Sequence, residues 1–341
     1  MALNHPEVRF VTHRDLLNGV VLDALAPNVR GFIVHGKAHS RRVVEELFQS
    51  IPAKDFMLHE LSGAFESEAH YLAFRLRAFG AGQVVAVGGG AVQDVCKAAA
   101  HMVGIPLISL PTLVATDGVG SPVAVLKGDD GKSTSTGAAA PTLIFICQEL
   151  FRAVPRGYWA AAAGDVIGNL VSVRDCRRFY KDEYEALSVG CELAEEAAMR
   201  ILQSPYYRWD CPEFQKLLVE AALTSSRAML ASGDSRPCSG AEHLISHSID
   251  ALGLAPRQLH GIQVGGVTPE LLELHEAPML AKKVRQILAE LQAPSSLLQL
   301  DGVVSEKLIE IRRTADHVRP GRQTVLNTLD EPEFIELFSS H

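Results

Sequence analysis

The chain has 341 residues, 47% hydrophobic and 21% charged, which is typical of a folded globular protein with a large core. Its formal net charge of −8, without any long run of lysine or arginine, argues against nucleic acid and anionic membranes as partners. The 6 cysteines form no CxxC pair, and neither a signal-peptide pattern nor a membrane-spanning apolar run is present, so we expect a cytoplasmic protein.

The first part of the chain alternates short apolar runs with amphipathic stretches. Strands are predicted at 31–36, 84–90, 106–112 and 142–147, and helices at 39–51 and 66–80. Strands that alternate with helices indicate a parallel sheet with helices on its faces. The polar stretch GDDGKSTSTG (128–137) is the best candidate for a mobile loop.

A glycine turn interrupts this pattern at VVAVGGGAVQDVCKAAA (84–100). Glycines allow a ligand to approach the backbone, and the N–H groups at a helix N-terminus favour an anion, so the form suits a pyrophosphate. A tight strand-to-helix turn without a ligand gives the same pattern. Lys97, further along this helix, could contact a phosphate or simply face solvent. The loop TLVATDGVGSP (112–122) follows another predicted strand and would lie at the same edge of the sheet.

The second part of the chain reads as helical. Helices are predicted at 158–180, 185–204, 212–232, 240–251, 277–292 and 304–315. We therefore expect a nucleotide-binding α/β domain at 1–154 and an all-α domain at 155–341 that carries the metal and substrate sites.

The segment EHLISH (242–247) places His243 and His247 four residues apart, on one face of a helix. Both could bind one metal ion, or one could be only a neighbour. His260, which precedes a presumed helix, and Asp165, an acid within an apolar helix, are further candidate ligands. Each could equally be an ordinary polar residue: a solvated carboxylate or a half-buried, hydrogen-bonded ring.

Five segments in order, GGGAVQDVCK, PTLVATDGVGSP, AAAAGDVIGN, GDSRPCSGAEHLISHSID and LHGIQ, resemble the sn-glycerol-1-phosphate dehydrogenase family. That family belongs to the superfamily of iron-containing alcohol dehydrogenases, glycerol dehydrogenases and dehydroquinate synthases. The resemblance implies a Rossmann-like domain followed by a helical one, as in dehydroquinate synthase. It also implies reduction of a small phosphorylated ketone, such as dihydroxyacetone phosphate, by NADH or NADPH. Assembly into a homo-oligomer is left open.

The resemblance also implies site residues. Asp165, His243 and His260 would hold one divalent metal, zinc in most members and nickel or iron in others. The residues expected to bind the cofactor are Gly88, Gly89, Gly90, Asp94, Thr112, Thr116 and Ser121. Asp117 and His247 would serve proton transfer on the substrate side, and Arg236 is the candidate for holding the substrate phosphate.

Three departures from the family pattern concern the substrate. HGIQ stands where HGEQ is usual, FICQ replaces a strand ending in aspartate, and the sequence beyond residue 270 matches poorly. A related phosphorylated or phosphonylated carbonyl compound is therefore also considered. Lys37, Arg41 and Arg42 follow the strand at 31–36, where a 2′-phosphate would be met, which slightly favours tolerance of NADPH.

Two alternatives stay open. A sugar-phosphate cyclase like dehydroquinate synthase would use NAD only transiently and would release phosphate, but such enzymes usually present glutamate where Asp165 stands. A non-catalytic relative that kept the fold is the second alternative.

Overall fold

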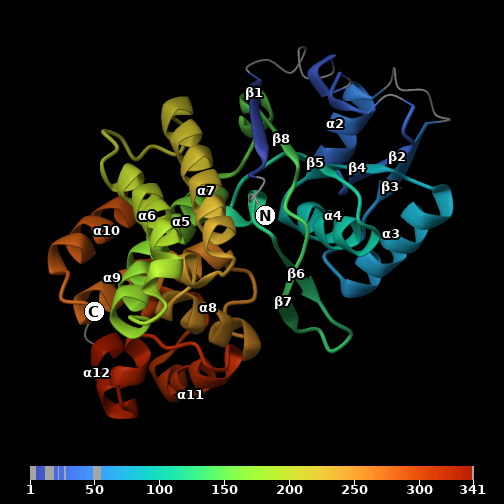
Figure 1. Cartoon of the computed structure of the whole chain (residues 1–341). Helices are drawn as coiled ribbons and strands as arrows, with labels where there is room; N and C mark the ends of the chain where they lie inside the picture. Colours follow the sequence, from blue (N-terminus) through green and yellow to red (C-terminus); the bar gives the residue numbers. More distant parts are fainter. Residues whose placement is uncertain (1–4, 12–18, 22, 27, 49–54, 340–341) are drawn as a thin grey trace. The chain divides into compact units, whose positions relative to one another are not determined.

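The computed structural model describes residues 5–11, 19–21, 23–26, 28–48 and 55–339. The chain forms two compact units, one of residues 1–114 and 118–154, the other of residues 115–117 and 155–341 (Figure 1). The short segment Ala115–Asp117 belongs to the second unit, which the sequence did not indicate.

The first unit is built on a six-stranded sheet in the order β1-β8-β5-β4-β2-β3, and each described pair of neighbouring strands is parallel (Figure 1). The strands are β1 (Glu7–Val11), β2 (Gly31–His35), β3 (Phe56–Glu60), β4 (Gln83–Gly88), β5 (Leu107–Pro111) and β8 (Leu143–Cys147). The four predicted strands are β2, β4, β5 and β8, the inner four of the sheet, and all of their residues are buried. This confirms the parallel α/β architecture.

The two edge strands were missed by the sequence reading. An edge strand exposes part of its length, so β1 and β3 mix charged and apolar residues and lack a continuous apolar run. The stretch 128–137 was also misjudged as a loop. Its second half forms β7 (Ser133–Gly137), which pairs antiparallel with β6 (Val123–Lys127). The two threonines of β7 favour an extended backbone, although most of this strand is exposed.

After β2 and after β4, the chain continues towards opposite edges of the sheet. From β2 it proceeds to the neighbouring β3, whereas from β4 it proceeds to β5 on the other side. In open parallel sheets, such a point leaves a crevice at the carboxyl ends of the two strands. The glycine turn at Gly88–Gly90 is located there, directly before α4 (Gly90–Val103). Helices α2 (His39–Leu47) and α3 (Glu66–Phe79) also belong to this unit.

The second unit contains α-helices and 3₁₀ turns and, within the described residues, no strand. Its helices are α5 (Arg156–Phe179), α6 (Tyr184–Leu202), α7 (Pro212–Ser232), α8 (Ala241–Ala251), α9 (His260–Leu274), α10 (Pro278–Glu290), α11 (Leu308–Val318) and α12 (Glu331–Ser339). The 3₁₀ turns among the described residues of both units are η1 (Asp117–Val119), η2 (Gln148–Phe151), η3 (Arg236–Cys238), η4 (Leu297–Gln299), η5 (Ser305–Lys307) and η6 (Val325–Thr328). Among the described helices, none has both the length and the apolar character needed to cross a bilayer.

Helix α5 is the central element of this unit and contacts α6, α7, α8 and α9. Its approach to α9 depends on glycine. A Cβ atom on Gly164 would lie 2.1 Å from the carbonyl oxygen of Gly261, and one on Gly261 would lie 2.0 Å from the carbonyl oxygen of Ala161. Because these neighbours are backbone atoms, no side chain can move aside to make room. Asp165 and His260 are adjacent to these glycines, so the same contact sets their separation.

We predict that Gly164→Ala separates α5 from α9, lowers the free energy of unfolding by about 1–3 kcal/mol or more, and weakens metal binding. Denaturant unfolding and the metal content of the purified protein measure the two effects. Gly157→Ala is the matched control, because it lies on the same helix with nothing within 4 Å of the added Cβ. Equal stability and metal content in both variants would contradict this role of the glycine contact.

Candidate metal centre and nucleotide turn

Asp165 lies within α5, in a run of alanine, valine and isoleucine, and is only 3% exposed. An isolated carboxylate at such a position is costly unless hydrogen bonds or a cation stabilise its charge. Its Oδ2 accepts a hydrogen bond of 2.8 Å from the backbone N–H of Asp117. Its Oδ1 faces the imidazoles of His243 and His260.

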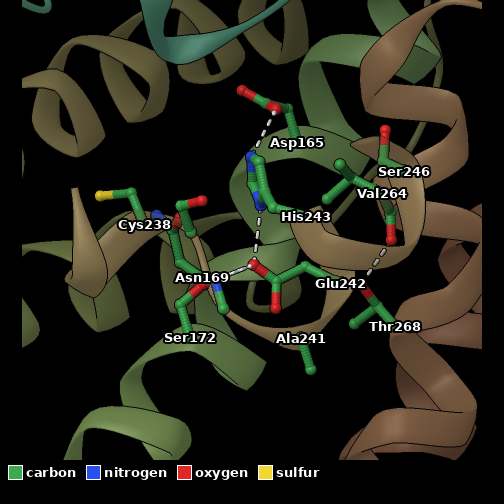
Figure 2. Close-up of polar contacts among 12 residues, drawn as sticks. Asp165, Asn169, Ser172, Cys238, Ala241, Glu242, His243, Ser246, Val264 and Thr268 are labelled. Atoms are coloured by element: carbon green, nitrogen blue, oxygen red, sulfur yellow. Dashed lines mark hydrogen bonds and ion pairs between the residues drawn. The ribbon is translucent and has the colours of Figure 1, made fainter. Parts of the chain in front are cut away.

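His243 is oriented by the residue that precedes it on α8. Its Nδ1 lies 2.7 Å from Oε1 of Glu242, and Figure 2 shows the ring between Asp165 and Glu242, with one nitrogen towards each. Glu242 also accepts hydrogen bonds from the hydroxyl of Ser172, at 2.5 Å, and the backbone N–H of Gly240, at 2.8 Å. An ionised carboxylate can only accept, so Nδ1 carries the proton and Nε2 presents its lone pair.

His260, the first residue of α9, is oriented in the same manner. Its Nδ1 lies 2.9 Å from the hydroxyl of Ser246, which donates its own proton to Oε1 of Gln263 at 2.6 Å. The amide nitrogen of Gln263 in turn donates to Asp250 at 3.1 Å, which fixes the orientation of that amide. The hydroxyl must therefore accept from Nδ1 of His260, and its Nε2 is also left with a lone pair.

Three ligand atoms thus face one point. Oδ1 of Asp165 lies 3.8 Å from Nε2 of His243 and 3.7 Å from Nε2 of His260. These separations are too long for hydrogen bonds. They approach the spacing of about 3.3 Å between two ligands of a tetrahedral ion with bonds of about 2.0–2.1 Å. Two imidazole nitrogens and one carboxylate oxygen suit zinc, nickel or iron, so the residues present fit a divalent metal.

The pKa values of these groups follow from burial and neighbouring charge. Burial raises the pKa of Asp165 to about 7, and the charge of Asp117 acts in the same direction. Burial lowers the pKa of His260 to about 3, so its ring is neutral at neutral pH. Burial opposes charge on His243, but the hydrogen bond and charge of Glu242 outweigh it and raise the pKa. A cation between the three groups would stabilise the ionised form of Asp165.

A second group, His247, Asp250 and His260, also brings three ligand atoms together. It fits a metal less well, because Nδ1 of His260 is bound to Ser246 and its Nε2 faces Asp165. The carboxylate of Asp250 is exposed and accepts a hydrogen bond from Gln263. The geometry therefore favours Asp165 over Asp250 as the carboxylate ligand.

His247 and Asp117, the two residues predicted to act in proton transfer, have different neighbours. The ring of His247 stacks on that of His260, with centroids 5.5 Å apart, and its Nε2 accepts a hydrogen bond of 3.1 Å from Arg319. Asp117 accepts from the hydroxyl of Ser225 at 2.8 Å through Oδ2. Their roles in proton transfer stay predictions.

Arg236, the predicted phosphate ligand, contacts two carboxylates. Its guanidinium donates to Glu183 at 2.6 Å and to Asp234 at 2.9 Å, and it lies over the ring of Tyr180. Two carboxylates therefore already neutralise the charge of Arg236. An arginine without such partners would bind the substrate phosphate more strongly.

The predicted cofactor residues divide between the two units. Gly88 ends β4, Gly89 caps α4 and Gly90 begins it, with nothing within 4 Å of the position of a Cβ on Gly90. This open helix N-terminus fits the phosphates of a nucleotide. In the same unit, the backbone N–H of Thr112 donates to Gly88 at 3.2 Å, and the hydroxyl of Ser121 donates to Val123 at 3.4 Å. Thr116 belongs to the second unit.

Lys97 is neither a phosphate ligand nor a solvated side chain. It is fully buried, forms an ion pair of 2.7 Å with Asp94, and donates to the carbonyl oxygens of Gly118 and Val123. Lys97 therefore holds the loop after β5, and Asp94 balances its charge. A role of Asp94 in binding the cofactor stays a prediction.

Asp175, which holds the start of α8 in place, was not predicted from the sequence. This buried residue of α5 accepts hydrogen bonds from the backbone N–H of Ala241, at 2.9 Å, and of Val325, at 2.8 Å. Its Oδ1 also lies 3.0 Å from Nε2 of His275. One carboxylate thus joins α5 to the start of α8, the end of α9 and η6. Its partners are distant in sequence, so spacing could not reveal it.

Comparison with known proteins identifies the family of the chain. The family model described as iron-containing alcohol dehydrogenase matches residues 17–155. The glycerol-1-phosphate dehydrogenase [NAD(P)+] of Pyrococcus abyssi is 33% identical over 300 residues, which cover 87% of this chain and 85% of that protein. The enzyme of the same name from Pyrococcus furiosus is 37% identical over 71% of this chain and 69% of that protein.

The chain belongs to the glycerol-1-phosphate dehydrogenase family of iron-containing alcohol dehydrogenases. This confirms the resemblance read from the five segments. Among solved structures, a probable glycerol dehydrogenase from Sinorhizobium meliloti has the same fold, with a TM-score of 0.78 at 19% identity over 99% of this chain and 96% of that chain. A sulfoacetaldehyde reductase from Bifidobacterium kashiwanohense, solved with NAD+, has a TM-score of 0.71 at 16% identity over 98% of this chain and 96% of that chain.

We predict that the two histidines of EHLISH differ in their effect on the metal. His243→Ala removes one of the three ligand atoms and should abolish binding of the divalent ion, whereas His247→Ala should retain the metal and mainly lose turnover. Metal content by mass spectrometry and steady-state rates measure both. Equal loss of metal from the two variants would indicate instead that His243 and His247 both bind the ion.

Proposed function

We propose that this protein is a cytoplasmic, metal-dependent NAD(P)H oxidoreductase that reduces a small phosphorylated ketone, dihydroxyacetone phosphate to glycerol 1-phosphate or a related phosphorylated or phosphonylated carbonyl compound. The convergence of Asp165, His243 and His260 carries this proposal, together with the similarity over most of the chain to proteins named glycerol-1-phosphate dehydrogenase. All 6 cysteines are free, as in a reducing compartment.

In this scheme, a divalent metal supplies a Lewis acid that stabilises charge on the carbonyl oxygen, and the reduced nicotinamide supplies the hydride. Asp165, His243 and His260 would hold the ion, while Glu242 and Ser246 keep the two rings in the tautomer that ligation needs. The glycine turn at Gly88–Gly90 would bind the nucleotide phosphates through backbone N–H groups.

Asp117 and His247 are the proposed groups for moving the proton that the reduction consumes. The backbone N–H of Asp117 donates a hydrogen bond to Asp165. The carboxylate of Asp117 accepts a hydrogen bond from the hydroxyl of Ser225. Nε2 of His247 accepts from Arg319, so Nδ1 is the atom that carries its proton in the neutral ring. A proton could reach the product oxygen from either group, directly or through water.

The choice between NADH and NADPH depends on the residues after β2. Arg41 already pairs with Glu45 at 2.9 Å and lies 3.7 Å from Glu60, whereas Lys37 and Arg42 are exposed. These two side chains could meet a 2′-phosphate. We therefore propose that both cofactors are accepted.

The test is oxidation of NADH and NADPH, followed by absorbance, with metal-loaded protein and a panel of phosphorylated and unphosphorylated ketones. We expect stoichiometric oxidation with a phosphorylated ketone, and loss of the rate after removal of the metal by a chelator. Release of inorganic phosphate with only catalytic amounts of NAD would indicate a sugar-phosphate cyclase. Bound metal without turnover of any substrate would favour a non-catalytic relative.

A further inference from the structure

Two arginines that the sequence did not single out, Arg319 and Arg322, converge on one small cluster of hydroxyl groups. They follow α11, in the segment VRPGRQ (318–323). Arg319 donates from Nη1 to the hydroxyls of Ser235 and Ser239, each at 3.2 Å. Arg322 donates to the same Ser235 hydroxyl at 3.1 Å and to the carbonyl oxygen of Ser239 at 3.1 Å. Two guanidinium groups therefore share one acceptor oxygen.

The contacts make this cluster rich in donors. Each serine hydroxyl accepts from at least one arginine, and within the described part of the chain neither hydroxyl proton has a hydrogen-bond acceptor. Guanidinium groups can only donate. Arg322 lies 3.9 Å from Asp234, but that carboxylate already binds the backbone and the guanidinium of Arg236. Two cationic groups beside two hydroxyl groups that can still donate form a site suited to an anion with several oxygens.

The positive charges of Arg319 and Arg322 lie close enough to repel each other. Burial lowers the pKa of Arg319 to about 10, and the neighbouring charge of Arg322 acts in the same direction. The side chain of Arg322 is 13% exposed. A negatively charged ligand between the two groups would offset their repulsion, whereas a purely structural contact would be served by one arginine.

The cluster adjoins the metal ligands. Nη2 of Arg319 donates to Nε2 of His247 at 3.1 Å, and the ring of His247 lies 5.5 Å from that of His260 and 6.1 Å from that of His243. Ser239 immediately precedes Gly240, the N-cap of α8, on which His243 lies. Through His247, the cluster is therefore joined to the ring that stacks on the proposed metal ligand His260.

We infer that Arg319, Arg322, Ser235 and Ser239 bind the phosphate monoester of the substrate and make the enzyme specific for phosphorylated ketones. The inference rests on the proposed function and deepens it. Two other positive features suit a phosphate less well. Arg236 is already paired with Glu183 and Asp234. The first backbone N–H groups of α8, those of Gly240 and Ala241, are taken by Glu242 and Asp175.

The test compares Arg319→Met and Arg322→Met with Arg319→Lys, Arg322→Lys and the control Arg313→Gln. Arg313 lies on α11, is 66% exposed and pairs with Glu331. We expect the methionine variants to raise the KM for dihydroxyacetone phosphate about 10- to 100-fold, as for loss of a charge-assisted hydrogen bond. The metal content of all the variants should change little, and so should both kinetic constants of the Arg313→Gln control. The kcat/KM for unphosphorylated dihydroxyacetone should stay unchanged in Arg322→Met, whereas Arg319→Met also removes the donor to His247 and can lower kcat for every ketone. The lysine variants, which keep the charge, should fall between and decide the matter if a methionine variant does not fold.

A second readout does not depend on turnover. Calorimetric titration of the metal-loaded protein with inorganic phosphate should show binding that the methionine variants weaken by the same factor. If the wild type reduces no phosphorylated ketone, the proposed function fails, and loss of phosphate binding in the variants still supports the anion site. If the wild type is active and all four arginine variants keep both KM and phosphate affinity, the inference is overturned and the function stands. An increase in KM confined to Arg236→Met would overturn it as well.

Discussion

The burial of one carboxylate among apolar side chains is the constraint on which the second unit depends. Asp165 is in the interior of α5, where water cannot stabilise its charge, and burial raises its pKa to about 7. Several neighbouring groups reduce that cost. The backbone of Asp117 donates to one oxygen, and two imidazole lone pairs together with the other oxygen define the place for a cation. The glycine contact between α5 and α9 keeps the carboxylate and His260 close enough to share it.

A layer of hydrogen bonds behind the ligands makes this arrangement rigid. Glu242 fixes His243, and the series Asp250, Gln263, Ser246 fixes His260. Asp175 joins the start of α8 to α5 and to η6. Orientation of both rings before the metal arrives reduces the entropy lost on binding and favours tetrahedral over irregular coordination. The departure HGIQ leaves this layer intact, because the residue that contacts Ser246 is Gln263, which HGIQ retains.

Local signals predicted much of this structure, and long-range contacts account for the rest. The inner strands β2, β4, β5 and β8 have continuous apolar runs because both of their faces are buried, whereas the edge strands β1 and β3 do not. The proposed ligands Asp165, His243 and His260 were predicted from the order of the family segments, whereas spacing alone would have favoured His247 as readily as His260. Arg319 and Arg322 escaped notice because their partners, Ser235 and Ser239, lie about 80 positions earlier in the chain. Arg236 was predicted to hold the substrate phosphate because it lies just before α8. Its pairing with Glu183 and Asp234 could not be predicted from the sequence.

The central claim is that one divalent ion is held by two imidazoles and one carboxylate. X-ray absorption at the metal edge of the loaded protein tests it most directly, because that measurement reports the identity and distance of the ligand atoms. The account predicts nitrogen and oxygen atoms alone at about 2.0–2.1 Å, with the outer-shell scattering of two imidazole rings. A sulfur ligand at about 2.3 Å, or scattering from a single imidazole, would contradict it.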